Sequence, residues 1–204
     1  MSMRDEEYYV DSMMIIRVQD RLFKVPQHIL TTNSPVFRDM LNLPIPKDSE
    51  PDGSSDGQPL VLEGIKASEF ACLLKCIYPL KFRGKSFNFT LDEWKGVLGL
   101  AGAYEMVDVK AFAVEEMTPL ISGLPAIQVH LSQVYDIKQW LVSGAHELVQ
   151  RAEPLHAFDI EIMGAGYAAI IMSLREGRSR GFMISSKTYM FDKTDDRFLA
   201  RLGL

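Results

Sequence analysis

The segment GAGYAA, residues 164–169, has the glycine spacing that holds a pyrophosphate against the start of a helix in dinucleotide-binding folds. FDIEIM before it alternates like a strand, and GFMISSKTYMFD beyond the next helical pattern fits a second strand. A first parallel strand is normally apolar throughout because both of its faces are buried, yet this one carries Asp159 and Glu161. We therefore expect a close-packed helix turn here and keep a nucleotide-binding enzyme as the alternative of a different functional class.

The two cysteines, Cys72 and Cys76, lie one helical turn apart beside Lys75, a cation that can favour a thiolate. Two cysteines are too few for a disulfide framework or for a zinc module with paired cysteines. A central helix packed on two sides would instead bury both thiols as small apolar groups. We predict reduced, buried thiols and, with them, an intracellular protein of the cytoplasm or nucleus.

The remaining polar side chains lack the spacing of a catalytic or metal site. Four histidines are scattered along the chain without an HExxH motif: His28, His130, His146 and His156. Ser34 fits a turn, Ser54 and Ser55 fit a loop, and no G-x-S-x-G elbow marks a nucleophile. The charge run from Arg175 to Arg180 is typical of a solvated helix end. We expect no catalytic residue, no metal and no cofactor.

The composition is that of a globular protein with one sizeable domain or a domain plus an extension, at 204 residues and 47% hydrophobic content. The formal net charge of −5 gives no electrostatic reason to expect binding to a phosphate backbone. The first residues, MSMRDEEYYVDS, are acidic and polar where a signal peptide is basic and then apolar. We expect a soluble protein that binds neither nucleic acid nor a membrane.

The elements that would position these groups begin with two short β-prone runs, residues 13–18 and 21–26, which Gln19 and Asp20 join in a tight hairpin. Two short helices follow, QHILTT and PVFRDMLN. Ser34 and Pro35 start the second helix, because the hydroxyl can accept a free backbone N–H and proline tolerates the first helical position. PLVLEGI then suits a third strand.

The segment between Leu43 and Pro59 is rich in Pro, Gly, Ser and Asp and has no apolar periodicity. Such a composition buries too little surface to offset the entropy of ordering the chain. We expect residues 44–59 to form a mobile acidic loop, and deletion of Asp48 to Gln58 to cost little stability.

Helical periodicity dominates the rest of the chain. ASEFACLLKCIYP has one apolar face and should be a buried helix: Phe70, Leu73, Leu74 and Ile77. Thr90 and Glu93 have capping-box spacing ahead of a further apolar stripe: Trp94, Val97, Leu98, Ala101 and Tyr104. Glycines recur every third residue of that helix and suggest close approach of a neighbour: Gly96, Gly99 and Gly102. The later helices should bury Val107, Ala111, Val114, Ile127, Leu131, Val134, Ile137, Trp140, Leu141 and Leu148.

This order of elements resembles the BTB/POZ domain. The likeness rests on LFKVPQHIL with NSPVFRDML, on LVLEGIKASEFACLLKCIYP, and on VLGLAGAYEMVDVKAFAVEEM, and it covers about residues 11–121. The segment LSQVYDIKQWLVSGAHELVQRAEPL, with the later MG and LREGR, is similar to the helical extension of a large group of basidiomycete fungal BTB proteins. The resemblance implies an α+β fold, a small sheet flanked by helices, followed by an all-helical C-terminal extension.

The expected domains follow from this resemblance and from the composition. They are a polar N-terminal tail at 1–11, the BTB/POZ domain at 12–122, a helical extension packed on it at 123–180, and a C-terminal tail at 181–204 to which we assign no structure. SGLP after Ile121 is too short for a linker, so the extension should fold with the domain as one cooperative unit.

The function that the resemblance implies is protein–protein interaction without catalysis, by homo- or hetero-oligomeric assembly. The alternative is a substrate adaptor of a cullin-type ubiquitin ligase, although no Glu stands two places after Met40, Leu41, Leu43 or Ile45, where cullin adaptors often carry one. The partners would be proteins, the chain itself or a cullin among them. The candidate core or interaction residues are Met13, Ile15, Phe23, His28, Val36, Phe37, Met40, Leu41, Tyr78 and Trp140.

Overall fold

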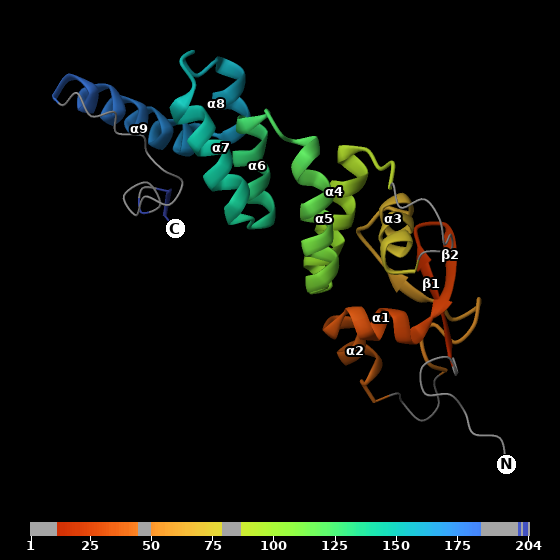
Figure 1. Cartoon of the computed structure of the whole chain (residues 1–204). Coiled ribbons are helices and arrows are strands. Elements are labelled where there is room, and N and C mark those ends of the chain that lie inside the picture. The colour runs from red at the N-terminus through yellow and green to blue at the C-terminus, as the bar shows by residue number, and fades with distance from the viewer. Residues whose placement is uncertain (1–11, 45–49, 79–86, 185–199, 201, 204) are drawn as a thin grey trace. The chain divides into compact units, whose positions relative to one another are not determined.

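The computed structural model describes residues 12–44, 50–78, 87–184, 200, 202 and 203. The chain divides into two compact units, Met1–Met117 and Thr118–Leu204. Figure 1 shows that strands and helices make up the first unit, whereas the described part of the second is helical. The α+β class expected from the sequence is confirmed.

Unit 1 begins with a three-stranded sheet of order β2-β1-β3. Strand β1 (Met13–Val18) pairs antiparallel with β2 (Arg21–Pro26) and parallel with β3 (Leu60–Leu62). The predicted hairpin is confirmed. Gln19 is the first residue of its turn and has a left-handed φ of 55°. The side-chain oxygen of Gln19 also accepts a 2.9 Å hydrogen bond from the backbone N–H of Ala67, so the hairpin turn caps the next long helix.

The inner face of the sheet is apolar and lies against a helix. Alternate residues of β1 on this face are 3% exposed or less: Met14, Ile16 and Val18. From β2, the ring of Phe23 meets the ring of Phe70 edge-on at 5.1 Å between centroids. Phe70 belongs to α3 (Ala67–Ile77), where Phe70 and Leu73 are fully buried and Leu74 and Ile77 are half-buried. The predicted helix is confirmed.

Two short helices, α1 (Gln27–Asn33) and α2 (Pro35–Leu41), follow the hairpin. The predicted helix start is confirmed, because Ser34 Oγ accepts a 3.1 Å hydrogen bond from the N–H of Phe37 and Pro35 takes the first helical position. Ser34 and Phe37 are both fully buried.

The segment between α2 and β3 contains ordered structure. Residues 45–49 lie outside the described part, but residues 50–58 form a turn with an isolated bridge between Ser55 and Gln58. The carbonyl of Gly53 accepts a 2.9 Å hydrogen bond from the N–H of Ile15 in β1. The composition led us to expect a mobile loop, yet one backbone hydrogen bond to β1 and bonds within the turn hold this half of the segment. Glycine at position 53 permits the φ of +84° that this turn requires.

Helices α4 (Leu91–Ala103) and α5 (Val107–Leu120) follow α3. The predicted capping box is confirmed: the Thr90 N–H donates to Glu93 Oε2 at 2.8 Å, and the Glu93 N–H donates to Thr90 Oγ1 at 3.3 Å. The close approach predicted for the glycines of α4 occurs at Gly96, where a Cβ would lie 2.5 Å from Glu69 Cγ of α3. A Cβ at Gly102 would meet nothing within 4 Å.

The buried face of α5 differs from the predicted one. Val107 is 76% exposed and Ala111 is exposed, whereas Val114 is buried as expected. The face that packs inward carries Val109, Ala113, Val114 and Met117. Two overlapping apolar stripes fit this sequence, and packing against the other elements of unit 1 selects one of them.

Unit 2 contains α6 (Pro125–Tyr135), α7 (Lys138–Gln150), α8 (Ala157–Met163) and α9 (Ala165–Ile184). Its core draws on all four helices and on Leu202 near the C-terminus. Helices α6 and α7 approach closely, because a Cβ at Gly144 would lie 2.6 Å from the carbonyl oxygen of Pro125. Most of the predicted inward residues are buried, but Val134 is 57% exposed.

The GAGYAA segment joins two helices and not a strand to a helix. FDIEIM, which alternates like a strand, lies in α8, and Gly164 ends that helix with a φ of +84°. Residues 181–184 of the expected second strand belong to α9, and the rest of that strand lies outside the described residues. The strand that a dinucleotide site requires ahead of its glycines is thus a helix. The expected turn between helices is present, but it is not close-packed, because a Cβ at Gly164 or Gly166 would meet nothing within 4 Å.

Two arginines of the charge run in α9, Arg175 and Arg178, bind backbone carbonyls near the end of α7. Arg175 donates to the carbonyl oxygens of Leu148 and Glu153, the latter at 2.8 Å. Arg178 donates to the carbonyl oxygens of Val149 and Gln150 at 2.9 and 3.0 Å. The carbonyls of Leu148, Val149 and Gln150 belong to the last turn of α7, where they lack partners within the helix and carry partial negative charge. Glu153 lies in the segment that follows α7. The expectation of a solvated helix end was wrong for Arg175 and Arg178, because the sequence does not show that α9 passes the end of α7, whereas Glu176 is exposed.

The expected packing of residues 123–180 on unit 1 stays a prediction. No described helix is long and apolar enough to span a membrane.

Candidate interaction surface

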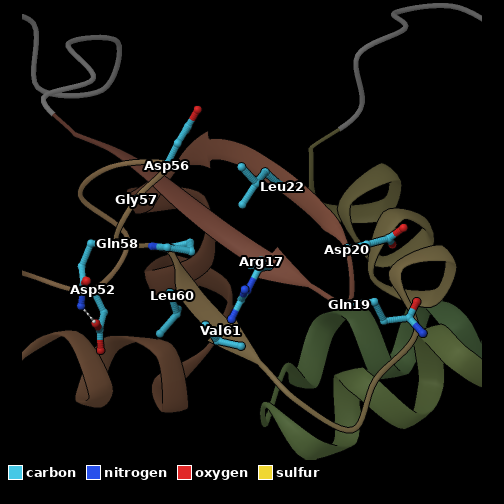
Figure 2. A pocket seen from close by; sticks show the side chains of 11 residues that line it. Arg17, Gln19, Asp20, Leu22, Asp52, Asp56, Gly57, Gln58, Leu60 and Val61 are labelled. Carbon is cyan, nitrogen blue, oxygen red and sulfur yellow. Dashed lines mark hydrogen bonds between the residues drawn. The ribbon is translucent and has the colours of Figure 1, made fainter.

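The outer face of the sheet carries exposed side chains in a fixed arrangement. Arg17 of β1 lies opposite Leu22 of β2 and opposite Val61 of β3. Directly paired residues of neighbouring strands point to the same face, so these three side chains share it. Figure 2 shows Arg17 on the central strand with Leu22 and Val61 on the strands at either side. The register of the strands determines which side chains point outward, because a shift of one residue would turn these three side chains toward the core.

Two of these side chains are large, aliphatic and open to solvent. Leu22 is 48% exposed and Val61 is 40% exposed, and Arg17 between them is exposed as well. Met13 continues the same face of β1 and is 45% exposed, whereas Ile15 between them is 6% exposed. The outer face therefore combines an apolar surface with one central guanidinium.

Acidic residues and the 50–58 turn surround this face. A hollow of about 650 Å³ is lined by the three central side chains together with Asp20, Asp52, Asp56 and Gln58. Asp52 is held in place, because its Oδ1 accepts a 3.0 Å hydrogen bond from Gln58 Nε2, drawn as a dashed line in Figure 2. The turn that carries Asp52 and Asp56 is bonded to β1 through Gly53. The Asp52 carboxylate therefore keeps its position in the lining of the hollow.

The residues that the sequence singled out fall into three groups. Ile15, Phe37 and Trp140 are buried. Four are half-buried: Phe23, Val36, Met40 and Leu41. Three are exposed: Met13, His28 and Tyr78. Trp140 belongs to the second unit, and the structure does not bring these residues together at one site.

The end of α2 carries a second, smaller hollow. It has a volume of about 570 Å³ and is lined by polar residues of α1 and α2 together with one leucine: Gln27, Thr31, Thr32, Arg38, Leu41 and Asn42. Leu41 is the residue from the predicted interaction set that reaches this hollow.

Sequence reasoning missed Arg17, Leu22 and Val61. A signal was present, because strict alternation in 13–18 and 21–26 assigns Arg17 and Leu22 to the face opposite Ile16 and Phe23. The pairing with Val61 had no sequence signal, since parallel pairing of β3 with β1 depends on the path of the chain between them.

The thiols of α3 are protected, as the sequence predicted. Cys72 is buried and Cys76 is half-buried. Burial raises the pKa of the Cys72 thiol, and the nearby Lys75 only partly opposes this rise. Burial, with the neighbouring Cys72 and Glu116, raises the pKa of Cys76 to about 12. Both groups are neutral thiols near pH 7 and are poor nucleophiles.

The described residues hold no cluster of three or more His, Cys, Asp or Glu side chains that could bind a metal ion.

The comparisons with known proteins agree with this architecture. The family model of the BTB/POZ domain matches residues 1–118, more than half of the 204 residues of the chain. No curated protein matches the sequence. BTB/POZ domains are generally modules for protein–protein interaction. The hairpin, the paired short helices, the third strand, α3, α4 and all but the last two residues of α5 lie within the matched residues. The chain belongs to the BTB/POZ domain family.

Proposed function

We propose that this protein is a non-enzymatic interaction module that assembles homo- or hetero-oligomers through the outer face of its three-stranded sheet. The observation that carries the proposal is the exposure of Leu22 and Val61 on either side of Arg17, all on one face. Covering solvent-exposed aliphatic side chains on neighbouring strands with a partner removes apolar surface from water, and this burial stabilises the complex.

We expect the charges around this face to determine which partner binds more than how tightly it binds. Arg17 is on the central strand, and Asp20, Asp52 and Asp56, from the two turns beside the sheet, line the same hollow. Charges at the edge of an interface stay partly hydrated and chiefly set the association rate and exclude wrong partners. Burial of Leu22 and Val61 would supply the affinity, at about 1.5 to 3 kcal/mol for each fully buried side chain.

The test replaces both aliphatic side chains in the full chain, as Leu22→Asp with Val61→Asp. We expect self-association to weaken at least tenfold, as measured by light scattering at concentrations from roughly 1 to 100 μM. Capture of partner proteins, identified by mass spectrometry, should weaken to the same extent. Val107→Asp is the control, because it replaces a 76% exposed aliphatic side chain of the same unit that belongs to α5 and not to the sheet.

Circular dichroism melts of all three proteins would verify that the folds are unchanged. Unaltered association and partners in the double variant, or equal losses in the Val107→Asp control, would contradict a role for the sheet face.

A cullin-adaptor role is the second candidate. It is favoured by the hollow at the end of α2, since Leu41 lines it beside Arg38 and Asn42. This is the part of the chain in which the sequence resemblance places cullin contacts. Co-purification of a cullin with the wild-type chain, lost in Leu41→Asp but kept in the sheet-face variant, would support this role and separate it from assembly through the sheet.

A further inference from the structure

Strand β2 is the outermost strand at one side of the sheet, because the order is β2-β1-β3. The N–H of Gln27 donates to the carbonyl oxygen of Ser12 at 3.0 Å, one register position beyond the end of the β1–β2 ladder. Hydrogen-bonded pairs recur at every second position of an antiparallel ladder, so Phe23 bonds to β1. Leu22 and Lys24, on either side of Phe23, therefore direct their backbone N–H and C=O groups away from β1.

These outward groups form an open edge of the sheet as far as the structure describes the chain. Between described residues, no backbone hydrogen bond involves the N–H or C=O groups of Leu22 or Lys24. Figure 2 shows Leu22 on this outermost strand and Asp20 in the turn before it. An edge strand with unpaired backbone groups is a template on which a further strand can add.

The side chains along this edge carry opposite charges at its two ends. Asp20 and Leu22 line the same hollow on the outer face, and alternation places Lys24 on that face as well. All three side chains are exposed. An acid, a leucine and a base thus follow one another at every second position. A lysine on an edge strand usually opposes pairing, unless the added strand brings an acid to it.

This series of three side chains is complementary to itself when its direction is reversed. If a second copy of β2 lies antiparallel to the first with the two Leu22 residues opposite each other, then Lys24 of each copy lies opposite Asp20 of the other. Because the backbone groups of Leu22 point outward, the two Leu22 residues can exchange two hydrogen bonds. The pairing then combines a central leucine pair with two pairs of opposite charge.

Neighbouring registers lack this combination. A shift of one residue would place Leu22 opposite Phe23 of the second copy, whose backbone groups are already bonded to β1. A shift of two residues would place Leu22 opposite Lys24 and would make the two Lys24 side chains diagonal neighbours, where their charges repel. Charge complementarity therefore selects the register centred on Leu22.

We propose that two copies of this chain associate through the edges of β2, antiparallel about a two-fold axis at Leu22, so that the three strands of each copy join into one continuous sheet. The inference rests on the proposed assembly function and names a second copy of the chain as the partner. Both copies contribute the same residues, so the contact closes as a dimer. The outer faces of the two sheets then form one surface with Arg17 and Val61 of each copy.

The test reverses the two charges in the full chain, one at a time. Lys24→Asp places two acids opposite each other at both charged positions, and Asp20→Lys places two bases there. Self-association of each variant, measured by analytical ultracentrifugation, should weaken by roughly five- to thirtyfold, because two attractive pairs become repulsive. The double variant Asp20→Lys with Lys24→Asp should associate as the wild type does. Lys138→Asp is the control, since it changes the net charge equally at an exposed position of unit 2.

A mixture of the two single variants tests the register itself. An edge with two acids then faces an edge with two bases, so fluorescence energy transfer between differently labelled chains should show mixed dimers that are tighter than either single variant alone. Leu22→Cys should also form a disulfide-linked dimer under oxidising conditions, because Cα atoms of a hydrogen-bonded pair lie about 5.5 Å apart, within the range of a disulfide. Val61→Cys, on the opposite side of the sheet, is the control.

A wild-type chain that stays monomeric up to roughly 100 μM, or single variants that associate as tightly as the wild type, would overturn the edge pairing. Weakened single variants that do not recover in the mixture would overturn it too, because net charge alone would then explain the loss. The proposed function has a separate outcome. Capture of partner proteins that is lost in Leu22→Asp with Val61→Asp but kept in Lys24→Asp would retain the outer face as an interaction surface without the dimer.

Discussion

Ser34 Oγ donates a 2.6 Å hydrogen bond to the carbonyl oxygen of Tyr104, 70 residues further along the chain. The same oxygen accepts a 3.1 Å hydrogen bond from the backbone N–H of Phe37 and so caps the N-terminus of α2. The ring of Phe37 lies 4.7 Å from the ring of Tyr104, between centroids. One buried hydroxyl therefore starts a helix and attaches it to the C-terminal end of α4.

Ser34→Ala removes both hydrogen bonds and leaves the carbonyl of Tyr104 without this partner. Loss of a helix cap costs about 1 kcal/mol, and a buried group without its partner costs about 1 to 3 kcal/mol more. We expect the free energy of unfolding, measured in denaturant, to fall by about 2 to 4 kcal/mol. Thr32→Ala, at a nearby exposed position, should change it by less than about 0.5 kcal/mol. Equal stability of the two variants would refute this account of Ser34.

Gly53→Ala tests whether the turn at 50–58 is a structural element. An alanine Cβ would lie 2.9 Å from Met14 Cγ and 3.3 Å from the carbonyl oxygen of Ile15, at a φ of +84°. A strained backbone of this kind costs about 1 to 3 kcal/mol, and the melting temperature should fall accordingly. Gly57→Ala is the control, because its Cβ would approach nothing closer than 3.9 Å.

Deletion of Asp48 to Gln58, expected from composition to be well tolerated, would remove the bond from Ile15 to Gly53. The structure now predicts a measurable loss of stability for this deletion. A deletion variant that melts at the wild-type temperature would show that the turn contributes nothing to the fold.

Trp140→Ala should destabilise unit 2 most strongly among single truncations of its core. Trp140 is 1% exposed, and its Nε1–H donates to Thr118 Oγ1 at 2.9 Å. Truncation of a buried tryptophan costs about 3 to 5 kcal/mol through lost burial and a residual cavity. Trp140→Phe keeps most of the apolar bulk but loses the hydrogen bond, so its cost should be smaller.

Hydrogen exchange in the Trp140→Ala variant also tests the predicted cooperativity of the two units. If they unfold together, the amides of α3 around Leu73 and Leu74 should lose protection along with those of α6 and α7. Protection lost only beyond residue 123 would mean that unit 2 unfolds by itself.

Asp159 should make unit 2 sensitive to acid. Burial alone acts to raise its pKa, but hydrogen bonds from the Arg151 guanidinium and the His156 backbone N–H outweigh burial and hold the pKa below its usual value. A carboxylate with a lowered folded-state pKa stabilises the fold above the pKa of the unfolded state, near 4 as a rough reference. This stability is lost as the pH falls through the folded-state pKa.

Asp159→Asn should therefore lower the melting temperature at pH 7, and the difference from wild type should shrink as the pH falls below about 4. Part of the loss at pH 7 arises because Arg151 keeps its charge without its partner. A difference that does not change between neutral and acidic pH would contradict the ion pair as its cause.

Arg175→Ala should destabilise the contact between α9 and the end of α7. The guanidinium donates to the carbonyl oxygens of Leu148 and Glu153, and each hydrogen bond of a charged group contributes about 1.5 to 3 kcal/mol. Arg175→Lys keeps the charge but cannot form both bonds in one plane, so it should restore only part of the stability. Ser173→Ala, at an exposed position of the same helix, is the control in denaturant unfolding.

Local chemistry in the sequence determined where many elements begin. The helix starts at Ser34 and Thr90 were predictable, because a cap needs only residues within the first turn. The hairpin of 13–26 was predictable for a similar reason, since alternating β-prone residues on both sides of a two-residue turn leave one register. Burial of Trp94 and Trp140 also followed from helical periodicity.

Contacts between distant elements were decided only by the tertiary structure. The choice of Val109 over Val107 as an inward residue, and the docking of Arg175 on α7, depend on where neighbouring helices pass. The exposed face around Arg17 depends on β3 joining β1 in parallel. Composition indicated an unstructured loop at Gly53 because it cannot show a backbone hydrogen bond to a strand far away in the sequence. Caps and periodicity act within a few residues, whereas these pairings exist only after the chain has folded.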